Sequence, residues 1–234
     1  MVTTGSIVKK PGTRKIKADE TRRALISAAA AVVGRHGYEG ASIAKITELA
    51  GVANGTFYNY FNTRQDLFDQ LLPAVGDSII DYIRSRLDRG VSGAERERQR
   101  IVAYFEFVQQ NRGFLRIKNE AEVYAPRAFK QHIQKFAGQY VKALARQLNK
   151  GEMKSIREDE LEAIAYMLLG AATYLTMLWR SVPTASRKQV CASLVSTYEK
   201  LVARGLFVTG HGASRSRGRN NKVGSAPARS VLLM

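Results

Sequence analysis

The chain contains few of the residues that disulfide-rich or metal-binding proteins need. Its single cysteine, Cys191, can form neither an internal disulfide nor a metal cluster, so we expect a reducing compartment. The ordinary role for such a cysteine is that of a small buried apolar residue. The three histidines, His36, His132 and His211, do not have the spacing of metal ligands. Only 5 of 234 residues are proline, so long segments lack a helix breaker, which favours an all-α fold.

The sequence also lacks the signatures of common enzymes and of membrane insertion. We find no glycine-rich phosphate loop, nucleophile elbow or zincin motif, and we therefore expect no catalysis, no cofactor and no metal. No apolar run approaches the roughly 18–20 residues that span a bilayer. The N-terminus is basic where a signal peptide would be apolar. These absences predict a cytoplasmic protein without a membrane partner.

Positive charge is in excess, with a formal net charge of +17. Such an excess suits a polyanionic partner, and nucleic acid fits it better than an anionic membrane surface. The two ends are the most basic, and residues 204–234 contain no acidic residue. Residues 9–17 are compatible with an arm that follows the DNA backbone or minor groove and with a solubilising tail. For the cluster near residues 215–222, a solvated tail is the more ordinary interpretation.

Helical periodicity and capping signals extend over most of the chain. We expect a first helix from Ala18 to Gly37 and a second from Ser42 to Gly51. A short segment follows over 56–61, and a fourth helix begins after Thr63, with Asp66 as capping-box partner and a kink or break at Pro73. Ser92 with Glu95 and Ser155 with Glu158 resemble further capping boxes. The remaining predicted helices lie at 94–111, 113–123, 126–150, 156–181 and 186–205.

Residues 42–64, SIAKITELAGVANGTFYNYFNTR, carry the functional information. An amphipathic helix ends at a glycine, and a short turn leads into a second helix. The residues that can close the inside corner are Ile46, Ala50, Val52, Phe57 and Phe61. The outer face carries hydroxyl and amide groups, which suit phosphate oxygens and base edges, on Thr56, Tyr58, Asn59 and Tyr60. The pattern predicts a helix-turn-helix that places a short helix in the major groove of DNA.

The segment GVANGTFYNYFNTRQDLF resembles the signature of the TetR family, commonly Gly-Val-Ser-x-Gly-Thr-Leu-Tyr-x-His-Phe-x-x-Lys-x-x-Leu. The matching residues are Gly51, Val52, Gly55, Thr56, Tyr58, Phe61 and Leu67. The resemblance extends over about residues 20–72. Two departures bear on operator sequence and affinity: Ala53 replaces a hydroxyl residue, and Tyr60 stands where histidine is common.

The resemblance implies a ligand-responsive transcriptional repressor that binds palindromic operator DNA as a homodimer. It implies phosphate contacts for Ser42, Thr56, Tyr58 and Tyr60, and base contacts for Asn59. Arg64 stands where the family usually has a lysine that reaches a phosphate. The full expected DNA-binding set is Ser42, Lys45, Asn54, Gly55, Thr56, Tyr58, Asn59, Tyr60 and Arg64.

The implied architecture is all-α, with two domains and two tails. A basic disordered arm over 1–17 precedes a three-helix helix-turn-helix DNA-binding domain over 18–72. A larger helical domain for ligand binding and dimerisation follows over 73–208, and a disordered basic tail over 209–234. The last two long helices, 156–181 and 186–205, would form a four-helix bundle with their counterparts in the partner. For some of their apolar residues the alternative is ordinary intramolecular core.

Aromatic and methionine residues crowd the C-terminal region, as they do in pocket linings. The expected ligand-binding residues are Tyr104, Phe107, Phe114, Tyr124, Phe136, Tyr140, Met167, Tyr174 and Met177. Polar contacts could come from Arg112, Arg116, Lys118, Glu120, Glu122 and His132. Each aromatic residue alone fits ordinary core, but together they predict a cavity for an apolar, aromatic or acyl effector that releases the operator.

Release of the operator would be a shift in population between two domain arrangements. The helix from Thr63 onward links the two domains and would transmit this change. Two alternatives remain open at this point. One is a DNA-binding protein that has no effector. The other is a transcriptional activator.

Overall fold

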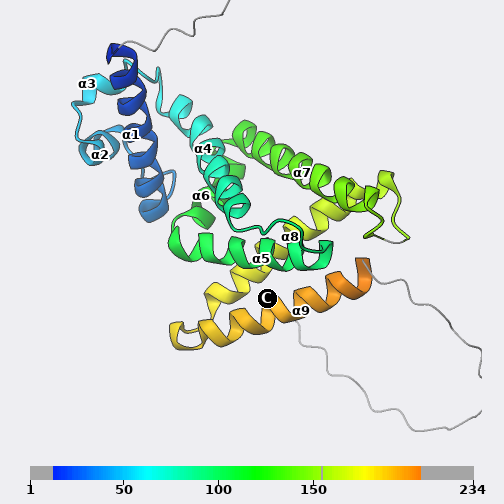
Figure 1. Ribbon diagram of the computed structural model, residues 1–234. Coiled ribbons are helices and arrows are strands. Elements are labelled where there is room, and N and C mark those ends of the chain that lie inside the picture. Colours follow the sequence, from blue (N-terminus) through cyan, green and yellow to red (C-terminus); the bar gives the residue numbers. More distant parts are fainter. Residues whose placement is uncertain (1–12, 154, 207–234) are drawn as a thin grey trace, which may run out of the picture.

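A computed structural model describes residues 13–153 and 155–206, and its regular elements are all helices (Figure 1). The predicted all-α class is therefore confirmed. The α-helices are α1 (Thr13–His36), α2 (Ile43–Ala50), α3 (Asn54–Phe57), α4 (Arg64–Ser85), α5 (Gly93–Gln110), α6 (Phe114–Tyr124), α7 (Pro126–Asn149), α8 (Leu161–Ser181) and α9 (Arg187–Leu206). Two single-turn 3₁₀ helices, η1 (Glu158–Glu160) and η2 (Thr184–Ser186), precede α8 and α9.

Several helix ends lie where local capping signals place them. The Ser42 side chain accepts a hydrogen bond from the Lys45 N–H at the start of α2. Gly51 ends that helix in the left-handed conformation, with φ 69°. Thr63 and Asp66 form the predicted capping box of α4.

Other boundaries differ from the predicted ones. α1 begins at Thr13, so the last residues of the expected arm are helical, because no breaker follows Gly12. The rest of that arm and the predicted tail lie outside the described residues. α3 begins at Asn54, earlier than expected. α4 continues through Pro73 as one element.

The predicted start of α8 is wrong. Ser155 adopts a positive φ of 61°, and the chain makes the η1 turn before α8 begins at Leu161. Ser155 therefore does not cap this helix. At Ser92 the prediction holds, because its side chain accepts a hydrogen bond from the Glu95 N–H.

The buried apolar side chains form two cores, and helices α4, α6 and α7 contribute to both. α1, α2 and α3 lie at one end of the molecule, and α4 runs from them towards α5 and α7 (Figure 1). Leu67 and Leu71 of α4 belong to the first core, whereas Ile79 and Ile83 belong to the second. α6 is divided in the same way, with Ile117 in the first core and its first residues in the second. The expected domain boundary at residue 72 remains a prediction, because α4 crosses it unbroken.

α8 is more apolar than the sequence analysis allowed. Residues 158–181 are long and apolar enough to cross a membrane by length and composition, so the prediction that no such segment exists is wrong. One such helix is weak evidence for a membrane span. Only 28% of its most apolar window is buried within this chain, so much of its apolar surface faces outward.

Candidate DNA-binding and effector sites

The helix-turn-helix corner is formed by α2, α3 and the turn between them. Ile46, Phe57 and Phe61 are fully or almost fully buried, as predicted for the inside of the corner. The sequence analysis missed Thr47, whose hydroxyl hydrogen-bonds the side-chain oxygen of Asn54 and also reaches the Ile43 carbonyl. This bond ties the first residue of α3 to α2, and it gives Asn54 a structural partner.

The outer face of α3 and the residues after it remain accessible. Tyr58 is 58% exposed, and its ring meets Phe57 edge-on. Asn59 is exposed beside it, whereas Thr56 and Tyr60 are half-buried. Polar groups that can reach DNA are thus presented by a segment whose apolar side is anchored in the core.

Three other predicted DNA contacts also have partners within the protein. The hydroxyl of Ser42 caps α2, and the Lys45 ammonium donates to the Gly40 carbonyl at 3.1 Å. Arg64 donates to the Ala41 carbonyl at 3.4 Å. The Arg64 bond joins the start of α4 to the residue before Ser42, and the Lys45 bond is local to the start of α2. Both cationic side chains are held at the protein surface.

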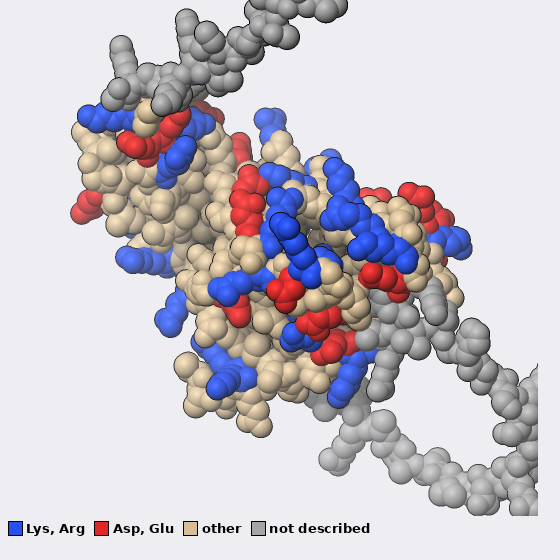
Figure 2. Space-filling model, viewed as in Figure 1, with Lys and Arg blue, Asp and Glu red and all other residues tan. Residues whose placement is uncertain are grey.

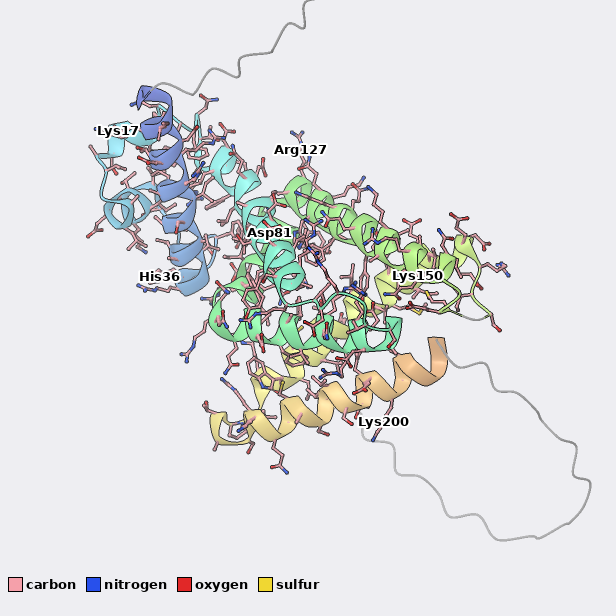
Figure 3. The ribbon with its side chains drawn as sticks, in the orientation of Figure 1. Lys17, His36, Asp81, Arg127, Lys150 and Lys200 are labelled. Atoms are coloured by element: carbon pink, nitrogen blue, oxygen red, sulfur yellow. The ribbon has the colours of Figure 1, made fainter. Side chains whose placement is uncertain are left out.

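Arg22 of α1 is a supporting residue that the sequence analysis did not identify. Its guanidinium lies 4.9 Å from the centre of the Phe61 ring and donates to the Tyr60 carbonyl at 3.3 Å. It also hydrogen-bonds Gln70 of α4. Figure 3 labels Lys17, in the second turn of α1, and His36, the last residue of this helix, which carries Arg22. No short-range sequence pattern indicates such a contact.

Basic side chains are not confined to the helix-turn-helix. Figure 2 shows Lys and Arg gathered over the region of α4 and α7 in this view. The basic residues of α7 are Arg127, Lys130, Lys135, Lys142 and Arg146. Net charge alone therefore does not locate the DNA-binding surface.

α6 is bonded directly to the N-terminal helices. Glu120 accepts a hydrogen bond from the Tyr38 N–H at 2.9 Å, and it pairs with Arg116 at 3.0 Å. Arg116 also donates to the Arg35 carbonyl at 2.6 Å. Gly34 and Gly113 lie so close that a Cβ on Gly113 would sit 2.7 Å from the Gly34 Cα. Arg116 and Glu120, which were predicted as possible ligand contacts, lie where α6 meets the N-terminal helices.

A cavity of about 390 Å³ lies among α5, α6, α7 and α8. Of the predicted ligand-binding residues, it brings together Tyr104, Phe114, Phe136, Tyr174 and Met177. Lys118, His132 and Thr173 also line it.

The other predicted ligand-binding residues lie elsewhere. Phe107 packs edge-on against Phe114 in the core. Tyr124 stacks on Tyr38 with ring centres 5.8 Å apart. Met167 is 64% exposed on the outer side of α8. Tyr140 lines a second cavity.

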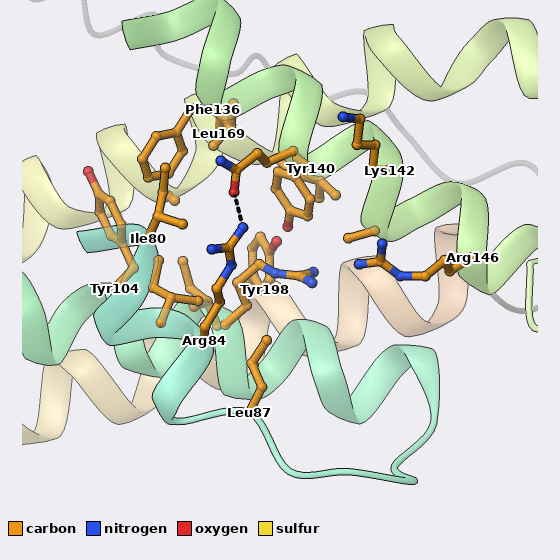
Figure 4. A pocket seen from close by; sticks show the side chains of 17 residues that line it. Ile80, Arg84, Leu87, Tyr104, Phe136, Tyr140, Lys142, Arg146, Leu169 and Tyr198 are labelled. Carbon is orange, nitrogen blue, oxygen red and sulfur yellow. Dashed lines mark hydrogen bonds between the residues drawn. The ribbon is translucent and has the colours of Figure 1, made fainter. Parts of the chain in front are cut away.

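The second cavity, of about 200 Å³, is shown in Figure 4. It shares Tyr104, Phe136 and Leu169 with the first cavity, so these side chains lie between the two. Its lining contains four cationic side chains and no acidic one: Arg84, Arg100, Lys142 and Arg146. Arg84 donates to the Gln139 side chain at 2.7 Å, the bond drawn in Figure 4.

The polar groups of the first cavity have shifted pKa values because they are buried. Burial lowers the pKa of Lys118 to about 8. Burial, aided by the charge of Lys118, lowers the pKa of His132 to about 4. Burial also raises the pKa of Tyr104. Each shift disfavours the charged form of its group, because burial removes that group from water.

The buried imidazole predicts that acid destabilises the fold. The unfolded chain binds a proton at His132 near pH 6.5, whereas the folded chain binds it only near pH 4. The free energy of unfolding should therefore fall as the pH drops from 6.5 to 4, by up to ~3 kcal/mol from this group. Urea denaturation across this range should show a smaller pH dependence in His132→Gln. The matched change His36→Gln, at an exposed site, should leave the dependence unaltered. Equal slopes in all three proteins would contradict a neutral buried His132.

Among the described residues, no group of three or more His, Cys, Asp or Glu could hold a metal ion. The first helices form a helix-turn-helix domain of the DNA-binding class, and the helices after it enclose a cavity. Residues 25–71 match the family model described as bacterial regulatory proteins, tetR family. Residues 25–71 therefore form a DNA-binding domain of the TetR type.

The relatives are themselves named as transcriptional regulators. The activator FasR of Mycolicibacterium smegmatis is 27% identical over 97 residues, which are 42% of this chain and 44% of FasR. The regulator LuxR of Vibrio harveyi is 30% identical over 112 residues, 48% of this chain and 54% of LuxR. The chain thus matches about half the length of these two relatives.

Solved structures share the fold over a greater length. A TetR-family regulator from Syntrophomonas wolfei has a TM-score of 0.67 and 22% identity, and the match covers 82% of this chain and all of that one. FadR from Bacillus subtilis, solved with stearoyl-CoA, has a TM-score of 0.61 and 20% identity over 74% of this chain and 97% of FadR. At these identities the likeness shows the fold alone.

Proposed function

We propose that this protein is a cytoplasmic homodimer that represses transcription by binding a palindromic operator, and that a small apolar or aromatic molecule releases it. The observation that carries the DNA-binding part is the accessible polar surface of α3 and of the turn after it, where Tyr58 and Asn59 are exposed beside the buried rings of Phe57 and Phe61. A rigid short helix with exposed hydroxyl and amide groups suits the major groove.

The proposed DNA contacts divide into positioning and specifying groups. Thr56, Tyr58 and Tyr60 would bind phosphate, together with Ser42, Lys45 and Arg64 at the starts of α2 and α4. Asn59 would read a base edge, since an amide can make two hydrogen bonds to adenine. Asn54 and Gly55 begin α3, and they would let its backbone approach the DNA closely.

Support for the dimer comes from the outward face of α8. Tyr174 is 72% exposed and Leu178 is 52% exposed, and Met167 continues the same apolar stripe. Exposed apolar surface of this extent on one helix is typical of a protein–protein interface. We propose that α8 and α9 pack against their counterparts in an isologous four-helix bundle. Two protomers would then present two α3 helices to the two operator half-sites.

Effector release requires a path from the cavity to the DNA-binding helices. α4 provides one path because it contributes to both cores. α6 provides a second path: one side lines the cavity through Lys118, and the other side is bonded to the N-terminal helices through Glu120. A ligand that binds better to a shifted α6 would favour a domain arrangement that does not fit the operator. Repression is our proposal for the sign of regulation, and activation is the alternative because the relative FasR is named an activator.

The experiment that tests this function is selection of bound sequences from a random duplex pool by the full-length protein. We expect a palindrome, with a slope of log affinity against log salt near −7 for roughly eight phosphate contacts. If no sequence is enriched and binding disappears at moderate salt, the DNA affinity comes from general basicity and the operator proposal is wrong.

The variant Asn59→Ala should relax specificity at one position of each half-site. Loss of a bidentate contact to a base costs about 1–3 kcal/mol of discrimination against the wrong base. Titration of the selected operator and of single-base variants should show this loss at one position only. The exposed neighbour Asn62, changed to alanine, is the matched control and should keep the wild-type preference at every position. An unchanged preference in Asn59→Ala would remove this residue from the base contacts.

A further inference from the structure

Lys118 of α6 is a mostly buried cation at the wall of the 390 Å³ cavity. Its ammonium donates to the Thr173 hydroxyl of α8 at 2.7 Å. That hydroxyl in turn donates to the Leu169 carbonyl at 2.9 Å. Within the described part of the chain, Lys118 forms no ion pair. A buried ammonium without an anion is costly, and a neutral hydroxyl compensates only part of that cost.

The charged and titratable neighbours do not neutralise this lysine. Glu122, one turn further along α6, also lines the cavity, but its side chain is exposed and forms no ion pair with Lys118. His132 of α7 is 6% exposed and lies on the same cavity. Asp77 of α4 pairs with Lys135 of α7. The wall therefore carries a positive charge at neutral pH, because the lowered pKa of Lys118, about 8, still leaves it mostly protonated.

A second polar group of this cavity, on α5, has no hydrogen-bond partner among the described residues. It is the buried hydroxyl of Tyr104. The tyrosine lines the cavity together with Lys118 and Thr173. The remaining lining is largely apolar and aromatic, including Phe114, Phe129 and Phe136. An ammonium and a phenol that can both donate, set in an apolar cavity, match an anionic group attached to an apolar body.

We propose that the ligand of this cavity is an organic carboxylate with an acyl or aromatic body, whose oxygens accept hydrogen bonds from Lys118 and Tyr104. That this ligand acts as an effector rests on the proposed function. That it binds in the cavity does not depend on that function. The anion supplies a buried negative charge, whereas the acidic lining residue Glu122 is exposed, so ligand binding offsets the cost of the buried ammonium. Lys118 lies on the same helix as Glu120 and Arg116, which are bonded to the N-terminal helices, so the anion acts directly on α6.

The cations of the second cavity favour an anion less strongly. Lys142 and Arg146 are exposed, and Arg100 is already paired with Glu97. Exposed cations are solvated by water, and an anion gains little from them. Lys142 therefore serves as the matched control for Lys118.

The experiment is calorimetric titration of the full-length protein, without DNA, with pairs of probes that differ only in charge. Suitable pairs are decanoate with decanamide and 4-phenylbutyrate with 4-phenylbutanamide. The wild type should bind the carboxylate of at least one pair about 10-fold or more tightly than the amide. Lys118→Met should lose this preference, Tyr104→Phe should reduce it, and Lys142→Met should keep it.

Proton uptake gives a readout that a merely structural role would not produce. Because burial lowers the pKa of Lys118 to about 8, carboxylate binding near this pH should take up part of a proton, measured in buffers of different ionisation enthalpy. This uptake should be absent in Lys118→Met. The proposal is overturned if amide and carboxylate bind alike, if Lys118→Met retains the preference, or if no probe binds.

Failure of the proposed function has a different signature. Carboxylate preference without release of the selected operator would contradict effector control and leave the ligand class intact. Release of the operator by neutral probes alone would contradict the ligand class and leave effector control intact.

Discussion

Replacing Glu97 with alanine should lower the free energy of unfolding by about 3–5 kcal/mol, the usual cost of removing one partner from a buried ion pair. The Glu97 side chain is only 1% exposed, and that of its partner Arg100 is 14% exposed. The carboxylate also accepts a hydrogen bond from the Tyr140 hydroxyl of α7. The Arg100 guanidinium lies 4.6 Å from the centre of the Tyr140 ring. The substitution would leave a guanidinium without its anion and a phenol without its acceptor.

The same helix contains a matched control. Glu95 and Arg98 have the same spacing and pair at 2.7 Å, but their side chains are 34% and 38% exposed. Glu95→Ala should therefore cost less than about 1 kcal/mol. Urea denaturation followed by circular dichroism measures both changes. A loss below 1 kcal/mol in Glu97→Ala would mean that water reaches Arg100 and that the group is not a buried pair.

Replacing Leu178 with aspartate should raise the dimer dissociation constant by at least ~100-fold. In an isologous interface the change places two charges in the bundle, and each buried carboxylate without a partner costs several kcal/mol. Operator affinity should fall with the loss of the dimer, since one protomer would hold only one half-site. Sedimentation equilibrium measures the assembly, and titration of the selected palindrome measures the binding.

Leu49→Asp is the control for this charge effect. Leu49 is 50% exposed, similar to Leu178, but it lies on α2 at the far end of the molecule. Its replacement should leave the oligomeric state unchanged. A wild type that sediments as a monomer would exclude the proposed dimer, and a Leu178→Asp protein that remains dimeric would place the interface elsewhere.

The predictions that agree with the structure depend on residues close together in the chain. The cap at Ser42, the left-handed Gly51 and the Thr63–Asp66 box each involve residues within four positions of one another. Local hydrogen bonding decides such features before any tertiary packing. The inside corner with Phe57 and Phe61 follows from helical spacing in the same way.

The positions that the sequence analysis did not anticipate depend on contacts between distant segments. Composition placed Tyr124 and Met167 among the pocket residues, but the first stacks on Tyr38 and the second faces outward from α8. Charged residues of α6 were grouped together as possible ligand contacts. Packing separates them, because Glu120 faces the N-terminal helices while Lys118 faces the cavity.

The sequence by itself determined the helical class, the helix-turn-helix and its polar outer face, because these depend on period, capping and the residues of one short segment. Only the tertiary structure decided which polar side chains are removed from water. α5 contains two glutamate–arginine pairs at the same spacing, and nothing in their local sequence distinguishes them. Glu97 and Arg100 are buried because Tyr140 of α7 packs over them, whereas Glu95 and Arg98 remain in contact with solvent.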